Sequence, residues 1–518
     1  MKEVQILDCT LRDGGYYTDW DFNRELVDEY YKAMEALPID YVEIGYRSKP
    51  LSGYLGKYFY CPDYVMKDAK EKMPSKKLAV ILNEKDVRAE DAVGLLSACI
   101  PYLDLIRIAV APENIERAIL LANAVKAMGF EVAFNVMYMS KWLDAPEFMA
   151  KIKDVNGVVD YLYLVDSYGG ATPNAVQELM DELSYVDKTV LGFHGHNNME
   201  MALINTLTAM EAGAGILDCT ITGMGRGAGN LKTELLLTYF AKQGKQVSFT
   251  QLSRVVDLFE KLNEKYGWGP SLPYMFSGAN SLPQKEVMEW VGLNRYPIST
   301  IVNALSNKKN LVSDNVQLPK FEPAKKYKKA LIIGGGPSVT EHQTAIEHLI
   351  KNGDENDICV IHAGVRYLDK FYELGHDQYY CMVGSEKDKL ERRFEDLSEL
   401  KFPCIFAPYP RKMGTFLPEG IEDYAKELRQ INFVKGFDDS LLAMAIQAAI
   451  DLGADKAYLV GYDGYEGQIS KAQFRIAREN QSIIDAATNG DAIDLVSCSN
   501  TNYENIEKSS IYSINQSA

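Results

Sequence analysis

Cysteine is scarce and scattered in this chain: the eight cysteines include no Cys-x-x-Cys pair and no close cluster. This excludes a zinc ribbon and a disulfide-stapled fold. Positive charge is also in short supply, because 55 Lys and Arg stand against 72 Asp and Glu and leave a net charge of −17. Such a balance disfavours nucleic acid and anionic membranes as partners. We find no signal peptide and no apolar run that could span a membrane, so we expect a cytoplasmic protein with reduced thiols.

At 518 residues the chain is too long for one ordinary hydrophobic core, so at least two domains are expected. Its first 240 residues alternate short apolar runs with helix-like stretches. Eight such runs predict an α/β fold with a (β/α)8 TIM barrel, and a doubly wound open sheet is the alternative. The expected strands are Val4–Asp8, Tyr41–Gly45, Leu78–Leu82, Leu105–Ala109, Val132–Met137, Tyr161–Val165, Val190–Phe193 and Leu217–Ile221.

The alternation of strand-like and helix-like segments stops after the predicted barrel and resumes later in the chain. Residues 1–245 form the predicted barrel, and residues 246–324 lose the strand pattern and are predicted to form a helical extension with a linker. Strand-like and helix-like segments alternate again in residues 325–518, which we interpret as a Rossmann-like domain. We also expect the protein to form a homo-oligomer.

Polar residues follow most of the expected barrel strands. In a TIM barrel, functional side chains lie where strands end and βα loops begin. The Asp13-Gly14-Gly15 run predicts a tight loop after the first strand. One polar residue at such a place would be an ordinary solvated or hydrogen-bonded group, but their number predicts a site. They are Arg12, Asp13, Glu43, Arg107, Asn135, Asp166, Ser167, His194, His196, Thr222 and Asn230.

The two histidines at the end of the seventh strand favour a metal site. Residues i and i+2 of a strand point to the same face, so His194 and His196 can share one target. Barrel closure brings strands seven, eight and one together, which adds Asp13 and, from a glycine-rich loop, Asn230. This mixture of nitrogen and oxygen ligands suits Mn²⁺ or Mg²⁺, with Zn²⁺ or Co²⁺ as alternatives. A packed, hydrogen-bonded histidine pair is the structural alternative.

Three motifs together resemble a known family. They are Asp8-Cys-Thr-Leu-Arg-Asp-Gly14, His194-Gly-His-Asn-Asn198 and Gly223-Met-Gly-Arg-Gly-Ala-Gly-Asn230. In this order they resemble the metal-dependent lyase and aldolase barrels, which include 4-hydroxy-2-oxovalerate aldolase, hydroxymethylglutaryl-CoA lyase and isopropylmalate synthase. The resemblance covers residues 1–240.

This resemblance implies a role for each motif. Asp13, His194 and His196 would bind the metal, with Asn230 as a further ligand, and Arg12 would stabilise an enolate. The implied substrate is a 2-oxo acid such as pyruvate, whose carbon–carbon bond is made or broken. The residues predicted to contact the substrate are Glu43, Arg107, Asn135, Asp166 and Ser167, although a structural salt bridge is an equal alternative for Glu43.

The motifs combine features of two branches of this family. Asp166-Ser-Tyr-Gly-Gly170 resembles the aldolases, whereas Asn197 is shared with the synthases. The catalytic histidine of the aldolases, four residues after Arg12, is replaced by Tyr16, which is our first candidate for the base; a metal-bound water is the second. A Claisen-type acyl-CoA condensing enzyme and a non-catalytic binding protein that retains the metal are the alternatives.

The C-terminal domain opens on a glycine-rich turn. Gly334-Gly-Gly-Pro-Ser338 lies between a strand and a helix, where a phosphate-binding loop or an ordinary turn are equal alternatives. Together with Val460-Gly-Tyr-Asp463, it diffusely resembles bacterial sialyltransferases and the group that contains archaeal hydroxymethylpterin pyrophosphokinase. This resemblance implies a nucleotide or nucleotide-sugar site and a place in cell-surface carbohydrate metabolism. The implied site residues are Gly335, Gly336, Ser338 and Asp463.

Overall fold

The computed structural model describes residues 4–293, 295–384, 390, 397, 402–415, 417–418, 420–467, 469, 471–490 and 492–517. Its contacts divide the chain into two compact units, Met1–Met288 and Glu289–Ala518. Each unit contains one parallel sheet.

The sheet of the first unit is a closed barrel of eight strands in chain order, and β1 pairs in parallel with both β2 and β8. This confirms the predicted TIM barrel and excludes the open-sheet alternative for this unit. The strands are β1 (Gln5–Asp8), β2 (Tyr41–Tyr46), β3 (Lys77–Asn83), β4 (Leu105–Val110), β5 (Glu131–Val136), β6 (Tyr161–Asp166), β7 (Val190–Gly195) and β8 (Ile216–Cys219).

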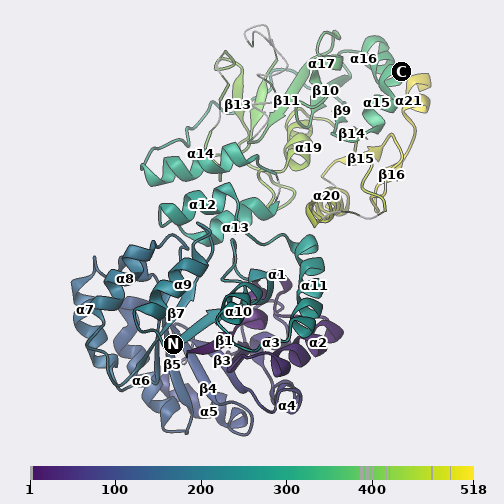
Figure 1. The fold of residues 1–518 in the computed structure, drawn as a ribbon. Helices are drawn as coiled ribbons and strands as arrows, with labels where there is room; N and C mark the ends of the chain where they lie inside the picture. The colour runs from purple at the N-terminus through teal and green to yellow at the C-terminus, as the bar shows by residue number, and fades with distance from the viewer. Residues whose placement is uncertain are drawn as a thin grey trace. The chain divides into compact units, whose positions relative to one another are not determined.

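Helices surround the barrel and follow its strands (Figure 1). Their apolar faces pack on the outside of the strands in one continuous core. The helices of this unit are α1 (Thr10–Thr18), α2 (Arg24–Ala36), α3 (Lys57–Tyr60), α4 (Asp63–Lys72), α5 (Ala92–Leu96), α6 (Ile115–Lys126), α7 (Pro146–Lys151), α8 (Pro173–Glu182), α9 (Ala202–Glu211), α10 (Thr233–Lys242), α11 (Phe249–Tyr266) and α12 (Leu272–Ala279).

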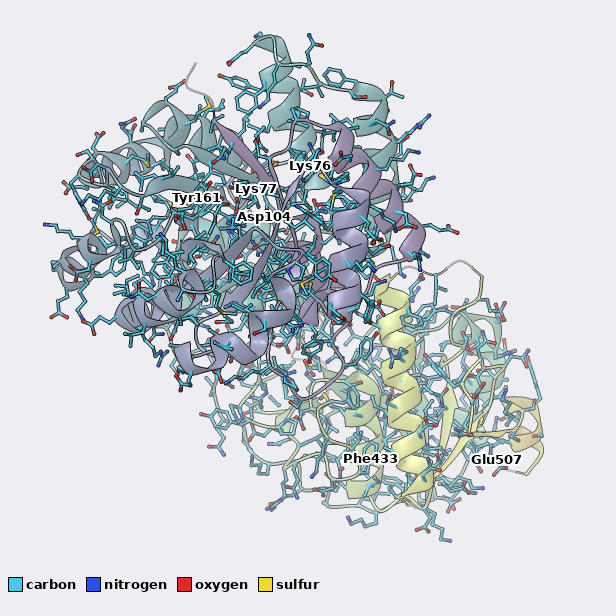
Figure 2. All side chains as sticks on the ribbon, turned by 90° about the horizontal axis from the view of Figure 1, so that it is seen from below. Lys76, Lys77, Asp104, Tyr161, Phe433 and Glu507 are labelled. Carbon is cyan, nitrogen blue, oxygen red and sulfur yellow. The ribbon has the colours of Figure 1, made fainter. Side chains whose placement is uncertain are left out.

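A second, smaller core fills the barrel interior, and a polar network covers its N-terminal end. The Tyr41 hydroxyl lies 2.7 Å from Glu131 Oε2 and 2.9 Å from the Tyr161 hydroxyl. Lys77 Nζ donates to Glu131 Oε1 at 2.6 Å, and both Lys77 and Tyr161 are marked in Figure 2. Because these groups use their hydrogen-bonding capacity on one another, we infer that the N-terminal end of the barrel has a structural role. Functional sites of TIM barrels lie at the opposite, C-terminal end of the strands.

The tight loop predicted after the first strand is wrong, because helix α1 begins at Thr10 and contains the two glycines. Asp8 Oδ1 accepts hydrogen bonds from the backbone N–H and the hydroxyl of Thr10, at 2.9 and 2.6 Å, which satisfies the first backbone donor of the helix. A Cβ on Gly15 would lie 2.1 Å from the Trp20 ring, and one on Gly14 would lie 2.5 Å from Met224 Sδ. The glycines therefore serve close packing, not a turn.

Helices α11 and α12 and the segment between them belong to the first unit. They contact the loops at the C-terminal ends of the barrel strands. Trp268 Nε1 donates to the Thr222 carbonyl at 3.1 Å, and Asn198 Nδ2 donates to the Tyr274 carbonyl at 3.0 Å. A Cβ on Gly170 would lie 2.1 Å from the Gly278 carbonyl. The loops after β6, β7 and β8 are thus braced by a segment that follows the barrel in sequence. The boundary between the units falls within α13 (Gln284–Leu293).

The sheet of the second unit is open and parallel, in the order β13-β12-β11-β10-β9-β14-β15-β16. The chain extends one edge from β9 to β13 and then returns to the other side of β9, so the strand order reverses between β9 and β14. Its strands are β9 (Lys329–Ile333), β10 (Ile358–His362), β11 (Gln378–Met382), β12 (Cys404–Phe406), β13 (Ala425–Glu427), β14 (Lys456–Val460), β15 (Asp494–Ser497) and β16 (Glu507–Lys508).

Helices and apolar side chains cover this sheet in three clusters. Among the described residues, the helices are α14 (Ile298–Lys309), α15 (Ser338–Glu341), α16 (Gln343–Asn352), α17 (Leu368–Phe371), α19 (Leu441–Asp451), α20 (Lys471–Asn489) and α21 (Ile511–Ser517). Across the described part of both units, every helix is too short or too polar to cross a membrane.

The packing of α1 yields a stability prediction. Gly15→Ala should lower the free energy of unfolding by about 1–3 kcal/mol, because its methyl group overlaps the Trp20 ring. Gly94→Ala on α5 is the matched control, since its Cβ would meet nothing within 4 Å. The control should be neutral or stabilise by about 0.5–1 kcal/mol. Urea titration followed by circular dichroism measures both, and equal losses would contradict the packing role of Gly15.

Candidate metal centre

Asp13, His194 and His196 converge at the C-terminal end of the barrel. Asp13 is on α1, His194 is in β7, and His196 directly follows β7. One potential ligand atom from each lies within 4.8 Å of the other two, and all three residues are buried. His194 Nε2 is 3.5 Å from Asp13 Oδ2. The structure thus brings together the three residues that the sequence predicted as metal ligands.

Each imidazole is oriented by a hydrogen bond at its other nitrogen. His194 Nδ1 donates to Asp218 Oδ2 at 2.8 Å, and His196 Nδ1 donates to the Asp166 carbonyl at 2.8 Å. With Nδ1 as the donor, Nε2 of each ring keeps its lone pair for a cation. Metal-binding histidines are typically held in this manner.

Asn230 completes the cluster. Its Nδ2 donates to Asp13 Oδ2 at 2.6 Å, and among the described residues its buried Oδ1 has no hydrogen-bond partner. A buried amide oxygen without a donor suits a cation ligand. Burial opposes ionisation of Asp13, but Arg12 and both histidines lower its pKa to about 2. The carboxylate, the amide oxygen and two imidazoles therefore fit a divalent cation.

A layer of charged side chains lies beside this cluster, at most 7% exposed. Arg12 Nε donates to Glu43 Oε2 at 2.7 Å, and Arg107 Nη1 donates to the same oxygen at 3.1 Å. Arg107 Nη2 donates to Asp218 Oδ2 at 2.5 Å, and Arg12 Nη1 also pairs with Asp13. Burial opposes ionisation of Asp218, but Arg107 and His194 lower its pKa. Both ends of this ion-pair chain reach the metal cluster.

The five predicted substrate contacts are all buried, and the structure engages them within the protein. Each guanidinium nitrogen of Arg107 has an acceptor, because Nε also donates to Asn135 Oδ1 at 2.9 Å. Asp166 accepts from the backbone N–H groups of Gly169 and Ala171, and Ser167 Oγ accepts from the N–H of Tyr138. Arg107 and Glu43 therefore hold each other in place beside the metal cluster, and substrate contact by the five residues stays a prediction.

Tyr16 lies on α1 four residues after Arg12. Its side chain is 39% exposed, and its hydroxyl is 3.2 Å from the hydroxyl of Tyr46 on β2. The Tyr16 ring contacts Trp20 edge-on, with 5.0 Å between the centroids. Tyr16 is thus more accessible than the metal cluster, at the position where the sequence predicted a base.

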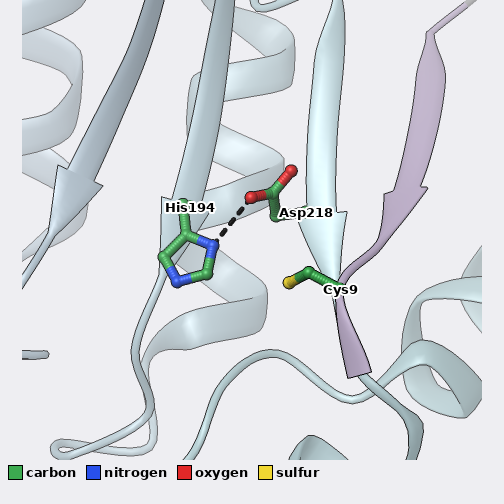
Figure 3. Close-up of side chains that lie close together, drawn as sticks. All are labelled: Cys9, His194 and Asp218. Atoms are coloured by element: carbon green, nitrogen blue, oxygen red, sulfur yellow. Dashed lines mark hydrogen bonds and ion pairs between the residues drawn. The ribbon is translucent and has the colours of Figure 1, made fainter. Parts of the chain in front are cut away.

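Sequence reasoning missed Asp218 and Cys9. Figure 3 shows Asp218 of β8 accepting from His194, with Cys9 beside them. Cys9, His194 and Asp218 could also group around an ion, but burial raises the Cys9 thiol pKa well above its usual value, and Asp218 already binds Arg107 and His194. This triad therefore supports the metal cluster. The signal in the sequence was a lone aspartate within the apolar strand of residues 216–219.

The glycine-rich turn of the second unit is already hydrogen-bonded. The N–H groups of Gly334, Gly336 and Ser338 donate to Val460, Gly461 and the Asp463 carboxylate at 2.7, 2.8 and 3.0 Å. The following helix α15 has only four residues. Three N–H groups of the turn are therefore used within the protein, which favours the ordinary turn of the two alternatives left by the sequence.

Gly335, Gly336 and Asp463 nevertheless line a cavity of about 510 Å³, whereas Ser338 is buried beside it. The cavity lies where β9 and β14 end, and its other lining residues include Arg366 and Tyr465.

Comparison with known proteins identifies the family to which the barrel belongs. The HMGL-like family model matches residues 105–259. The 4-hydroxy-2-oxovalerate aldolase of Carboxydothermus hydrogenoformans is 30% identical over 267 residues, which is 50% of this chain and 77% of that protein. The chain belongs to the HMGL-like family. Like its relatives, this HMGL-like protein is an enzyme of the lyase class.

Two further matches support this membership. Oxaloacetate decarboxylase of Mycobacterium tuberculosis is 28% identical over 294 residues, covering 54% of this chain and 84% of that protein. A crystal structure of the N-terminal domain of a candidate aldolase from Bacteroides vulgatus has 52% identity and a TM-score of 0.55. It covers 58% of this HMGL-like chain and the whole of that domain.

The orientation of His194 yields a prediction about metal affinity. Asp218→Asn should weaken Mn²⁺ binding by about 10–100-fold, because the ring loses its charged partner. Asp104→Asn is the control: Asp104 accepts from the N–H of Leu78 near the other end of the barrel and should not affect the metal. Calorimetric titration with Mn²⁺ measures the affinity, and circular dichroism checks the fold. Wild-type affinity in folded Asp218→Asn protein would contradict this role.

Proposed function

We propose that the barrel is a divalent-metal-dependent aldolase that makes or breaks a carbon–carbon bond of a 2-oxo acid through a pyruvate enolate. The observation that supports this most is the placement of Arg12 beside Asp13, within the cluster of Asp13, His194 and His196. Mn²⁺ or Mg²⁺ is the proposed ion, held by these three residues and Asn230. When bound, it supplies Lewis-acid stabilisation of the substrate's carboxylate and keto oxygens.

Arg12 is the proposed enolate-stabilising residue. Two of its nitrogens are held by Glu43 and Asp13, whereas Nη2 has no acceptor within the described residues. Fixing two nitrogens pre-orients the third for a negative oxygen that develops during the reaction. Trp20 Nε1 also donates to the Arg12 carbonyl at 2.8 Å and fixes the backbone. Arg12 is therefore rigid before substrate binds.

Tyr16 is the proposed proton-transfer group for the aldol hydroxyl. Its exposed position on α1 and its contact with Tyr46 support this role, because the Tyr16 hydroxyl can take the substrate proton while it releases its own to solvent water, with the Tyr46 hydroxyl holding it by a hydrogen bond. A metal-bound water is the second candidate for the base.

Decarboxylation is a second candidate function. The resemblance to an oxaloacetate decarboxylase and the Tyr16 that replaces the aldolase histidine favour it. Loss of CO₂ from oxaloacetate breaks the C3–C4 bond, leaves the electron pair on the same pyruvate enolate, and needs no base for an aldol hydroxyl. Assays of oxaloacetate decay and of pyruvate addition to an aldehyde discriminate the two.

The proposed function is tested by exchange of the pyruvate methyl protons for deuterium, followed by NMR without CoA. Exchange that depends on added Mn²⁺ or Mg²⁺ is expected. Dependence on CoA would favour the Claisen-type alternative. Stoichiometric metal without exchange would favour the non-catalytic alternative.

Arg12→Lys should retain metal but slow this exchange by about 10²–10³-fold, because a point charge cannot reproduce the guanidinium fork. Arg47→Lys is the matched control, since Arg47 is another barrel arginine that binds backbone carbonyls, among them those of Leu95 and Tyr60. Near-normal exchange by Arg12→Lys would exclude Arg12 from enolate stabilisation.

For the second unit, we propose a Rossmann-like domain that binds a nucleotide or nucleotide sugar in the cavity of about 510 Å³. The reversal of strand order between β9 and β14 supports it, because open parallel sheets bind ligands at such points. Because the N–H groups of Gly334, Gly336 and Ser338 are engaged, Arg366 and the aromatic ring of Tyr465 are the proposed contacts for phosphate and base.

Gly335→Val should abolish nucleotide binding without unfolding, since its Cβ approaches only Arg366 Cδ, at 3.9 Å, on the cavity wall. Gly375→Val is the control, because a Cβ there meets nothing within 4 Å. Calorimetry of the full-length protein with nucleotides and nucleotide sugars, cytidine compounds first, measures binding. No binding to folded wild-type protein at millimolar ligand would contradict the proposal.

A further inference from the structure

Arg226 lies in the glycine-rich loop after β8, next to the metal cluster. Its loop ends at Asn230, and Arg226 Nη2 donates to the Ser167 carbonyl at 3.4 Å. Ser167 adjoins Asp166, whose carbonyl holds His196. The Arg226 guanidinium carbon is also 6.0 Å from the centroid of the Tyr16 ring. Arg226 therefore reaches from the eighth βα loop to the sixth βα loop and to helix α1.

The charge of Arg226 has no carboxylate partner among the described residues, unlike that of its neighbours. Arg12 pairs with Glu43 and Asp13, and Arg107 pairs with Glu43 and Asp218. Within the described part of the chain, the contacts of Arg226 are with neutral groups, a carbonyl and an aromatic ring, and its side chain is partly buried. In a chain with a net charge of −17, a partly desolvated guanidinium without an acid suits an anionic ligand.

We propose that Arg226 forms a subsite for a second carboxylate of the substrate, so that the enzyme acts on a 2-oxo dicarboxylate. This inference rests on the proposed 2-oxo acid function of the barrel. The keto and first carboxylate groups belong to the metal cluster and Arg12, and the distal carboxylate lies against Arg226. A planar carboxylate matches one guanidinium fork with two parallel hydrogen bonds, whereas the neutral neighbours of Arg226 supply no further charge for a phosphate dianion.

The subsite also discriminates between the two reactions. A guanidinium that pairs with the distal carboxylate stabilises its charge in the bound substrate. Decarboxylation removes that charge as CO₂, so the pairing would stabilise the ground state more than the transition state. Aldol cleavage leaves the distal carboxylate intact on the released carbonyl compound. The subsite therefore favours an aldolase whose second product is an aldehyde or ketone that carries a carboxylate.

The test compares ligands that differ only in the distal carboxylate. Mn²⁺-loaded full-length protein is titrated calorimetrically with 2-oxoglutarate and with 2-oxovalerate, which share a five-carbon chain. The wild-type protein should prefer 2-oxoglutarate by about 10–100-fold, the range expected for a charge-assisted hydrogen bond. Arg226→Gln should reduce this preference to less than about threefold, and Arg226→Lys should restore part of it.

Exposed Arg254 on α11 provides the matched control, because Arg254→Gln removes the same charge from an outer helix and should keep the preference. Equal wild-type affinities for the two acids, or a full preference in Arg226→Gln, would overturn the subsite. Pyruvate proton exchange is measured in parallel on the wild-type protein. A retained preference without exchange would contradict the proposed reaction and support the subsite, so the two failures are distinguishable.

Discussion

A chain of buried ion pairs that ends in a histidine connects the two sides of the metal cluster. Arg107 is its centre: the residue is fully buried, and its guanidinium bridges Glu43 and Asp218. Removing one partner from such a chain would leave an uncompensated buried charge, at about 3–5 kcal/mol. The ligands Asp13 and His194 terminate the chain, so their positions depend on every link between them. The links run in the order Asp13, Arg12, Glu43, Arg107, Asp218 and His194.

The closed barrel makes this chain geometrically feasible. Its members come from α1, β2, β4, β7 and β8, and all reach one end because the strands are parallel. The pairing of β1 with β8 sets Leu7 opposite Asp218 and Asp8 opposite Cys219, which brings Asp13 on helix α1 to the loop of Asn230. An open sheet would separate these two strands. The metal cluster is thus a direct consequence of closure, and the helices outside the barrel determine how closely the loops approach.

The strands and the three metal-binding candidates could be predicted because they depend on local patterns: apolar runs, glycine punctuation, and a His-x-His pair at a strand end. Features that depend on partners distant in sequence could not. Gly15 signalled a turn, but the Trp20 ring occupies the space where a side chain would be. In the sequence Asp218 is an isolated polar residue of a strand. Its partners, His194 on β7 and Arg107 on β4, are evident only in the folded barrel. The acceptors for the turn at Gly334 likewise lie at the end of β14 and just after it, more than 120 residues later in the sequence.

The same charged layer implies a link between metal binding and stability. Glu43 Oε1, Asp218 Oδ1 and Asn230 Oδ1 are buried without hydrogen-bond partners among the described residues. Unsatisfied buried acceptors cost about 1–3 kcal/mol each, so an apolar core of similar volume would be more stable than this one. A divalent cation compensates only part of this set directly, through Asn230, but it attracts every carboxylate in the layer. Because the proposed ligands assemble only in the folded barrel, a cation at about 100 times its Kd would add about 2.7 kcal/mol of stability. The buried carboxylates therefore have two effects. They lower the stability of the metal-free barrel, and they make the stability of the folded barrel depend on cation binding.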